Sequence, residues 1–438
     1  MTWQKTRSIL IPLLTVSLIL SASAILIGYG RGYRINVNKP TQINATGIIS
    51  ATSDPVGAQV LVDTKLKTAT NNSFAISPDW YTVRIIKEGY IGWEKKVRVQ
   101  GEVVTRADAY LFPTNPSLSP ITTSGLLVPT LSPDGGKIAF VVPADATRDG
   151  NKKPGLYTLE LSDRPLGRNR DPKFIAEGNF TPNVTLLWNP NDTEIILSDR
   201  SIATSYDLAD TTRIVALSPL TLATRLADWK KETDLRNLQK LAAFKASFID
   251  VATSSTSIIS FSPDESKLLY EATAAATIPQ VIVPPMIGTN PTEETRTITP
   301  GNLYVYDSKE DKNYLLLSDK EVKSLLPTPT PSPKSSRPGP PSIGLLSREA
   351  GSRFAGDIGY SIAPNGLAWF PTSRHLLLTG NGKIDVMEYD RTNWTTLYSG
   401  PFDGSFLAPW PSGSRLVILT NLNPGASTLP NLYTVNLR

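Results

Sequence analysis

Short apolar strands, each introduced by a tight turn that contains proline, recur over most of the chain. In the clearest copy, Leu131 precedes the turn Ser-Pro-Asp-Gly-Gly-Lys, and the apolar run IAFVV follows. Further copies begin at Trp188, Phe261, Trp369 and Trp410. Proline and aspartate between two strand-like runs are typical of a β-turn. The pattern therefore predicts a repeated antiparallel hairpin.

Each hairpin is followed by another strand with an LYV-like pattern, expected at 155–159, 302–307, 384–387 and 431–435. The shortest interval between copies, from 369 to 410, is 41 residues, and one four-stranded propeller blade takes about 40–50 residues. Radial repetition of such sheets also protects their edges. We therefore predict a β-propeller over 121–438 with five readable blades.

A sixth blade is the alternative, built from residues 319–362 or completed by strands near 118–128. The chain ends on an LYV-like strand. A strand from the N-terminal side of the domain is therefore expected to complete the last sheet and close the ring.

Three segments interrupt the repeat. Apolar residues recur at roughly helical spacing between 219 and 249, which predicts a helical insertion whose second helix is capped by Thr233 or Asp234; they are Leu222, Leu226, Trp229, Leu235, Leu238, Leu241 and Phe248. Residues 276–300 are rich in Pro and Thr and form a further excursion. The proline-rich segment 327–341 has no apolar anchor, so it predicts an extended, solvated loop.

The N-terminal segment 8–30 carries no charge and follows Lys5 and Arg7. A helix of this length, at about 1.5 Å per residue, crosses a bilayer core. A cleaved signal peptide is the alternative, since Ala22-Ser23-Ala24 has the small-x-small form of a cleavage site. The apolar run continues past that site, which favours a transmembrane signal anchor at 1–30 and a linker at 31–45. The rest of the chain is then expected on the extracytoplasmic side of the cell membrane.

Residues 46–113 alternate short strands with tight turns, which predicts a small antiparallel β-sandwich. The run from Ser53 to Asp63, with Pro-Val-Gly-Ala at 55–58, resembles the PEGA domain. Tyr-Thr-Val at 81–83 and Lys-Glu-Gly-Tyr at 87–90 resemble its second half. Two positions depart from that family: Thr64 replaces a usual glycine, and Asp79-Trp80 replace a usual Pro-Gly. The resemblance implies an envelope-associated spacer or adhesive module without catalysis.

The Ser-Pro-Asp-Gly turn resembles the TolB-like, WD40-like propeller repeat, best in the copies that start at Leu131 and Phe261. A short linker is expected at 114–120 between the two folded parts. The whole arrangement resembles membrane-anchored bacterial PEGA-domain proteins that also carry a propeller. That resemblance implies no activity.

The amino-acid composition limits the number of domains and excludes several classes of catalytic and metal-binding site. A chain of 438 residues is expected to form two or three domains. The absence of cysteine excludes disulfides, thiol catalysis, iron–sulfur clusters and cysteine zinc sites, and the single histidine excludes a His-rich metal site. The net charge of +5 is mild and no basic stripe is interleaved with aromatics, so nucleic acid is not an expected partner. We predict no catalytic residue, no cofactor and no metal.

Some residues recur in the repeat and need a structural or a chemical explanation. Asp134, Asp192 and Asp264 are interpreted as equivalent turn residues that bond their own backbone, in preference to a ring of carboxylates. Three tryptophans, also taken to be in register, are interpreted as filler between blades in preference to sugar-stacking platforms; they are Trp188, Trp369 and Trp410. Outside the register, the candidates for exposed contacts are Trp80, Trp93 and Trp394.

His375 lies in a strand-like run, so a catalytic triad has to be considered. The chain has no Gly-x-Ser-x-Gly elbow. The histidine is therefore expected to be solvent-facing or hydrogen-bonded within a blade. Gly380-Asn381-Gly382-Lys383 lacks the spacing of a phosphate-binding loop and is expected to form a hairpin turn.

Together these patterns favour a membrane-anchored, extracytoplasmic binding or scaffold protein of the bacterial cell envelope, without enzyme activity. A protein or cell-wall glycan partner is expected on the propeller face formed by the connecting loops. The segments 219–249 and 276–300 are the expected contacts. The alternative is an extracytoplasmic carbohydrate-active enzyme with paired carboxylates about 5–10 Å apart in a central pocket.

Overall fold

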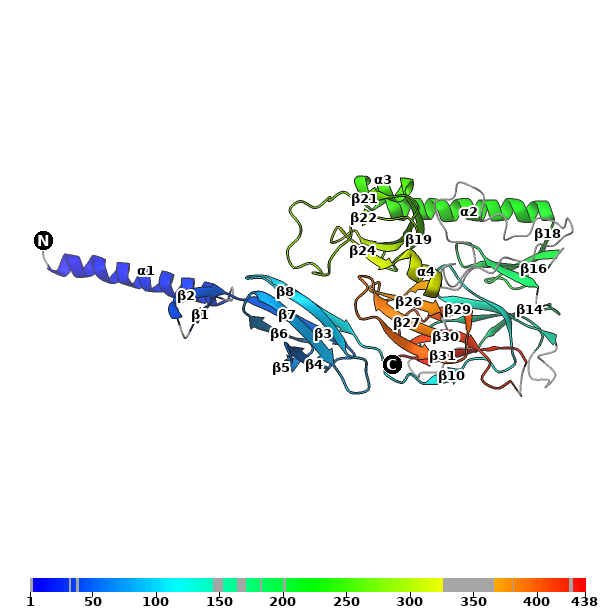
Figure 1. Ribbon diagram of the computed structural model, residues 1–438, viewed down its shortest axis with the longest axis horizontal. Helices are drawn as coiled ribbons and strands as arrows, with labels where there is room; N and C mark the ends of the chain where they lie inside the picture. The colour runs from blue at the N-terminus through cyan, green and yellow to red at the C-terminus, as the bar shows by residue number, and fades with distance from the viewer. Residues whose placement is uncertain are drawn as a thin grey trace. The chain divides into compact units, whose positions relative to one another are not determined.

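The structure is a computed structural model that describes residues 3–30, 33–36, 39–144, 153–163, 171–181, 183–199, 202–325, 366–380, 382–424 and 428–438 (Figure 1). The chain divides into two compact units. The first comprises Met1–Phe112 with Val283–Thr292, and the second comprises Pro113–Ile282 with Glu293–Arg438. The fold is mainly β, as predicted. The predicted loop at 327–341 and most of the stretch 319–362 lie outside the described residues.

The N-terminal helix α1 (Trp3–Gly30) is long and apolar enough to cross a membrane. Its segment Ile11–Gly28 has a mean hydropathy of 2.2, and the side chains along it are exposed. Pro12 lies inside the helix, and Thr15 Oγ1 donates to the carbonyl of Pro12 at 2.8 Å. After the helix, β1 (Tyr33–Asn36) and β2 (Lys39–Ala45) form an antiparallel hairpin within the segment expected to be a linker.

A two-sheet module follows. Its strands are β3 (Gly47–Asp54), β4 (Gln59–Val62), β5 (Lys65–Ala69), β6 (Asn72–Ile76), β7 (Asp79–Ile86), β8 (Trp93–Val99) and β9 (Val104–Tyr110). The sheets have the orders β6-β3-β9 and β5-β4-β7-β8, and their inner faces share one apolar core. The predicted sandwich is correct, but β3 and β9 are parallel, so it is not wholly antiparallel. The chain passes through the second sheet before β9 returns beside β3, and this crossover gives the two strands the same direction.

The departure from the PEGA pattern at Thr64 lies in the hairpin between β4 and β5. Asp63 and Thr64 both have positive φ, at 46° and 72°. Two-residue hairpins of type I′ require positive φ at both central positions. A glycine fits the second position without strain, whereas a β-branched residue does not.

The second unit contains five four-stranded antiparallel sheets among the residues described. The first consists of β11 (Leu127–Leu131), β12 (Lys137–Val142), β13 (Gly155–Glu160) and β14 (Lys173–Glu177), and the second of β15 (Val184–Trp188), β16 (Glu194–Asp199), β17 (Ile202–Asp207) and β18 (Ile214–Leu217). The third consists of β19 (Thr256–Phe261), β20 (Lys267–Ala272), β23 (Leu303–Asp307) and β24 (Lys312–Leu317), and the fourth of β25 (Leu367–Trp369), β26 (His375–Gly380), β27 (Lys383–Glu388) and β28 (Thr395–Ser399). The fifth has the order β10-β31-β30-β29, with β10 (Leu118–Pro120), β29 (Asp403–Pro409), β30 (Arg415–Thr420) and β31 (Asn431–Asn436).

The fifth sheet joins the two ends of this unit. β10 pairs antiparallel with β31, so a strand from the N-terminal side does complete this sheet, as predicted. The strand comes from residues 118–120, within the segment 114–120 expected to be a linker, because its backbone pairs with the edge of β31. Thr122 Oγ1 donates to Asn431 Oδ1 at 3.0 Å, and it accepts the backbone N–H of Leu432 at 2.9 Å. These bonds are buried, so the pairing is held by both backbone and side-chain hydrogen bonds.

Apolar clusters lie between neighbouring sheets. Trp188 belongs to the cluster shared by the first and second sheets, and Trp410 to the one shared by the first and fifth. Trp369 belongs to the cluster shared by the third and fourth. The interpretation of these tryptophans as filler between sheets is therefore confirmed.

The predicted helical insertion consists of α2 (Pro219–Ala242) and α3 (Ala246–Ser254). Ser218 caps α2, and Pro219 takes the first helical position, where its missing N–H costs nothing. The predicted break at Thr233 or Asp234 is wrong, because α2 continues through both residues. No glycine or proline interrupts this stretch, and the Lys230–Asp234 ion pair spans the expected break along the helix.

The excursion 276–300 begins and ends in a short strand pair. β21 (Ala276–Thr277) pairs with β22 (Thr297–Ile298), and Ile298 is buried against the third sheet. Asp311 Oδ2 accepts the backbone N–H groups of Val281 and Ile282 at 2.6 and 2.8 Å. The ends of the excursion are thus fixed to the third sheet.

Candidate functional site

The five proline-containing turns share one geometry. In each turn the first residue donates its N–H to the carbonyl of the sixth and accepts the N–H of the fourth. Proline is always second, where its fixed φ suits a tight turn. The turns are 132–137, 189–194, 262–267, 370–375 and 410–415. The fourth residue is left-handed in every case: Gly135 (73°), Asp192 (59°), Glu265 (57°), Ser373 (58°) and Gly413 (74°).

Side-chain oxygens complete these turns. Asp134 and Asp264 each accept the backbone N–H two residues on, at 2.8 and 3.2 Å, which confirms their predicted turn role. Asp192 is not equivalent to them, contrary to the prediction. In the second turn Asn189 at the first position accepts the backbone N–H groups instead, and Asp192 occupies the left-handed position.

The assumed tryptophan register also needs correction. Trp188 and Trp369 each precede the first residue of their turn, whereas Trp410 is itself the first residue. Trp410 therefore lies one position later than the other two. Matching aromatic residues predicts one register for the three tryptophans, and the hydrogen bonds of the turns give another.

The left-handed residue of one turn contacts the neighbouring turn. Asp192 Oδ1 accepts the backbone N–H of Asp134 at 3.4 Å, and Lys137 Nζ donates to the carbonyl of Asp192 at 3.1 Å. Burial, and then the charge of Asp134, raise the pKa of Asp192 to about 6. Ser373 Oγ accepts the backbone N–H of Asp264 at 2.9 Å in the same way.

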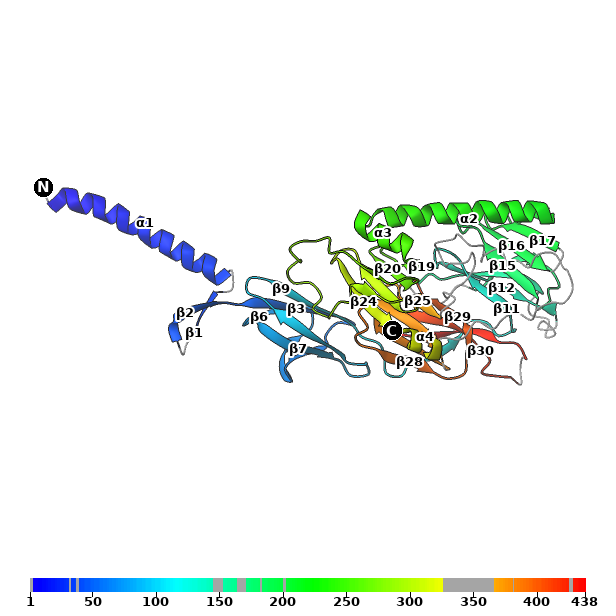
Figure 2. The ribbon, with the colours of Figure 1, turned by 45° about the horizontal axis from the view of Figure 1, so that its top comes forward.

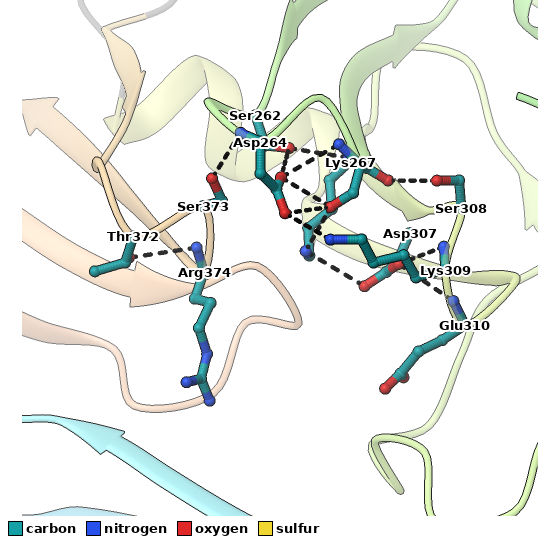
Figure 3. Close-up of polar contacts among 11 residues, drawn as sticks. Ser262, Asp264, Lys267, Asp307, Ser308, Lys309, Glu310, Thr372, Ser373 and Arg374 are labelled. Atoms are coloured by element: carbon teal, nitrogen blue, oxygen red, sulfur yellow. Dashed lines mark hydrogen bonds and ion pairs between the residues drawn. The ribbon is translucent and has the colours of Figure 1, made fainter. Parts of the chain in front are cut away.

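A polar cluster lies where turns of the third and fourth sheets meet (Figure 3). At its centre, Lys267 Nζ lies 3.5 Å from Asp307 Oδ2 and donates to Ser266 Oγ at 3.2 Å. Only 7% of the Lys267 side chain and 4% of the Asp307 side chain are exposed. The same ammonium lies 4.9 Å from the centre of the Tyr389 ring in the fourth sheet.

Asp264 forms the outer part of this cluster. Its carboxylate accepts hydrogen bonds from Ser262, Ser266 and Lys309. Burial raises the pKa of Asp264, but the hydrogen bonds from Lys309, Ser262 and Ser266 outweigh that effect, so the pKa lies well below its usual range. Asp264 therefore remains ionised at any physiological pH.

Most of this cluster lies within the third sheet, and Ser373 Oγ and the Tyr389 ring connect it to the fourth sheet. Asp307 Oδ1 accepts the backbone N–H groups of Lys309 and Glu310 at 2.9 and 3.3 Å, while its other oxygen faces Lys267. Each carboxylate is thus engaged by a cation and by neutral donors. Among the described residues, no three histidine, aspartate or glutamate side chains converge on a position that suits a metal ion.

His375 is buried and hydrogen-bonded within the fourth sheet. Its Nδ1 lies 2.9 Å from Thr372 Oγ1, and its ring packs edge-on against Phe370 at 6.3 Å between centroids. The prediction of a histidine satisfied in a blade is confirmed. Of the loop Gly380–Lys383, Asn381 lies outside the described residues, and its flanking strands β26 and β27 form the expected hairpin.

The tryptophans expected to be exposed have different environments. Trp93 is buried in the core of the two-sheet module, so that expectation is wrong for it. Trp394 is partly buried against the third and fourth sheets, and its Nε1 donates to Asp385 Oδ2 at 3.2 Å. Trp80 is 45% exposed, as expected.

Helix α2 bridges the second and third sheets (Figures 1 and 2). Trp229 packs against the second sheet, and Leu241 packs against the third. Polar contacts lie toward both ends. Arg225, nearer the start of the helix, forms an ion pair with Glu194 of the second sheet, and Arg236, nearer the end, donates to the carbonyl of Pro190 at 2.6 Å. Lys240 lies 3.1 Å from Glu265 Oε1 in the turn of the third sheet.

The opposite side of α2 is exposed and carries leucines. Leu220, Leu235 and Leu238 are 78%, 52% and 44% exposed. The helical spacing of the sequence identified the leucines of this segment but not which of them face solvent. We refer to these three residues as the leucine stripe.

Known proteins resemble this chain in the two-sheet module and in the overall fold. Residues 46–115 match the PEGA domain family, and no curated protein sequence matches the chain. Among solved structures, the chain is similar to a TolB-like protein from Agrobacterium tumefaciens, with 11% identity over 69% of this chain and 76% of that chain and a TM-score of 0.21. It is also similar to TolB from Acinetobacter baumannii, with 12% identity over 81% of this chain and 59% of that chain and a TM-score of 0.19. For oligogalacturonate lyase from Vibrio parahaemolyticus the identity is 10% over 74% of this chain and 94% of that chain, and the TM-score is 0.28.

These TM-scores are low, and the fold described above rests on the strand pairing of the chain itself. The PEGA match covers the module and leaves the five-sheet unit unassigned. Together with an N-terminal helix apolar enough to span a membrane, it supports an envelope-associated, extracytoplasmic interaction fold.

Proposed function

We propose that this chain is a membrane-anchored, extracytoplasmic binding protein whose five-sheet unit presents the leucine stripe to a protein partner. Helix α1 anchors the chain, and the PEGA domain lies between the anchor and the binding unit in the sequence. The observation that carries the proposal is the stripe itself. Three leucines face solvent on a helix that is fixed to the neighbouring sheets by Trp229 and Leu241.

The stripe has the character of a docking site. Apolar side chains on a rigid element that continue to face water favour association with a complementary surface. Burying the remaining exposed area of Leu220, Leu235 and Leu238 would contribute about 1 kcal/mol per side chain. Because α2 is held at both ends, a partner would meet an ordered helix face and would lose little affinity to ordering it.

Deletion of 219–249 is a poor test, because Trp229, Leu241 and Phe248 belong to the core. The sharper variant is Leu235→Glu with Leu238→Glu, which keeps good helix formers and disrupts the stripe. Gln239→Glu, an exposed change on the same helix, is the matched control.

The assay is crosslinking in intact cells followed by purification of the full chain and identification of the partner. The wild type and Gln239→Glu should capture the same protein, and the double variant should lose it while its melting temperature is unchanged. Capture of that protein by all three chains at equal yield would refute the proposal.

One observation favours the carbohydrate-active enzyme as a second candidate. Asp192 has a raised pKa beside a second carboxylate, Asp134, and such pairs divide acid and base roles in glycosidases. Incubation of the purified chain with acidic and neutral polysaccharides, followed by a reducing-end assay, tests this candidate. Activity that disappears in Asp192→Asn would support it, and equal product from both chains or none from either would exclude it for those substrates.

A further inference from the structure

The outer face of the β5-β4-β7-β8 sheet in the PEGA domain carries an exposed aromatic residue with two cations. Trp80 in β7 pairs across the strands with Arg98 in β8, and Lys96 lies two positions before Arg98 on the same face. Lys96 Nζ lies 5.4 Å from the Trp80 ring centre, and the Arg98 guanidinium lies 6.0 Å from it. We call these three residues the Trp80 patch.

Nothing in the fold requires an aromatic residue there. The alternate residues Tyr81 and Val83 face the core, so Trp80 contributes no packing between the two sheets. None of the contacts shown for the nearby carboxylates is with Lys96 or Arg98: Asp79 Oδ1 accepts the Trp80 backbone N–H at 2.7 Å, Asp63 Oδ1 accepts that of Thr82 at 2.9 Å, and Glu94 lies 3.9 Å from Arg84. The patch therefore offers an amphipathic ring and two positive charges to solvent.

The sequence before the module has the same character. Segment 31–45 contains Arg31, Arg34 and Lys39 and no acidic residue, and Tyr29 and Tyr33 lie on either side of the end of α1. Aromatic residues favour the interface at the end of a membrane span, and basic residues near it are attracted by anionic headgroups. Sixteen residues separate Gly30 from Gly47, so the module remains within roughly 55 Å of the membrane even if they were fully extended.

We propose that the Trp80 patch docks the PEGA domain onto the anionic headgroup surface of the bilayer that α1 spans. The proposal rests on the membrane anchoring proposed above. Weak contacts suffice, because the tether already supplies a high local concentration of the module at the surface. Trp80 enters the interfacial layer, and Lys96 and Arg98 contact lipid phosphates. Docking sets the orientation of the module relative to the membrane.

The experiment uses the full chain reconstituted in phosphatidylcholine vesicles with or without phosphatidylglycerol. Brominated acyl chains quench nearby tryptophans, and subtraction of the Trp80→Phe chain isolates the Trp80 signal from the other seven tryptophans. We expect quenching of Trp80 in the anionic vesicles and its loss in Lys96→Glu with Arg98→Glu. Lys65→Glu with Lys67→Glu, an equal charge change at exposed positions of β5, should retain the quenching.

Flotation of the same vesicles reports separately on the anchor. If the chain floats but Trp80 is unquenched, or if quenching survives charge reversal at Lys96 and Arg98, the docking proposal is wrong and the anchor stands. If Trp80 responds to soluble polygalacturonate and not to vesicles, the patch binds an anionic glycan and the proposal is also wrong. If the chain does not float, the proposed anchoring is wrong, and so is the docking proposal that depends on it.

Discussion

Removal of one partner from the buried Lys267–Asp307 ion pair is expected to destabilise the second unit strongly. Lys267→Met keeps the length of the side chain and leaves the Asp307 carboxylate buried without its cation. Asp307→Asn keeps an oxygen for the N–H groups of Lys309 and Glu310 and leaves the ammonium alone. In both variants one charge stays in a site that is more than nine-tenths buried.

Breaking a buried ion pair costs about 3–5 kcal/mol, chiefly because the remaining charge is uncompensated. The lower end applies here, since Ser266 and the Tyr389 ring still stabilise the ammonium and backbone N–H groups still stabilise the carboxylate. We expect about 3 kcal/mol for each single variant. The double variant has no buried charge, so its cost should fall short of the sum of the two singles by about 2 kcal/mol or more.

The measurement is urea denaturation followed by hydrogen–deuterium exchange, scored on peptides from β20 and β23 so that the two units are separated. Lys309→Met is the control within the same cluster, because the Lys309 side chain is 65% exposed where it pairs with Asp264. That variant should cost less than about 1 kcal/mol. Single-variant costs below 1 kcal/mol, or strict additivity in the double variant, would refute the view that this cross-strand pair stabilises the third sheet.

Three further changes test other parts of the structure by the same exchange measurement. Thr64→Gly should stabilise the PEGA domain by about 1 kcal/mol, because it removes the strain of a left-handed threonine. The control Lys67→Gly, in β5, should destabilise the domain by about 0.5–1 kcal/mol. A loss of stability in Thr64→Gly would contradict the assignment of the turn. Burial, and then the charge of Asp134, raise the folded pKa of Asp192 above its unfolded value of 3.8. Its favourable contribution is therefore complete below pH 3.8 and is lost as pH rises through about 6. Asp192→Asn should flatten the stability curve in that window, and an unchanged slope would show that the pKa of Asp192 is not raised in the folded state. Gly155→Ala would place a Cβ 2.2 Å from a backbone carbonyl oxygen of β14 and should cost about 2 kcal/mol or more, so wild-type stability would show that β14 is placed wrongly.

The turns were predictable because their interactions are local. The pattern of proline with Asp or Ser indicates bonds that span at most five residues, and these form as expected in the turns of Asp134 and Asp264. The strand pattern also indicated the sheets and the completing strand β10. The Pro-Val-Gly-Ala segment indicated the PEGA domain, which the family match confirms.

What could not be predicted depends on neighbours distant in sequence. The turn Asn-Pro-Asn-Asp offers two amides and a carboxylate, and only the hydrogen bonds show that Asn189 completes the turn while Asp192 faces another turn. Leu235, Leu238 and Leu241 recur at helical spacing, which predicts one apolar face. Only Leu241 of the three is buried, because it is the one that contacts a neighbouring sheet. The parallel β3–β9 pair likewise follows from a crossover that alternation within a strand does not encode.

The position of β31 inside the fifth sheet bears on how the chain is synthesised. β31 lies between β10 and β30, although the ribosome adds it some three hundred residues after β10. A nascent chain therefore carries an unfinished sheet until β31 is translated. A stop codon at position 431 would remove this central strand and would leave its two neighbours unpaired, so the product should be degraded as rapidly as one with a damaged core.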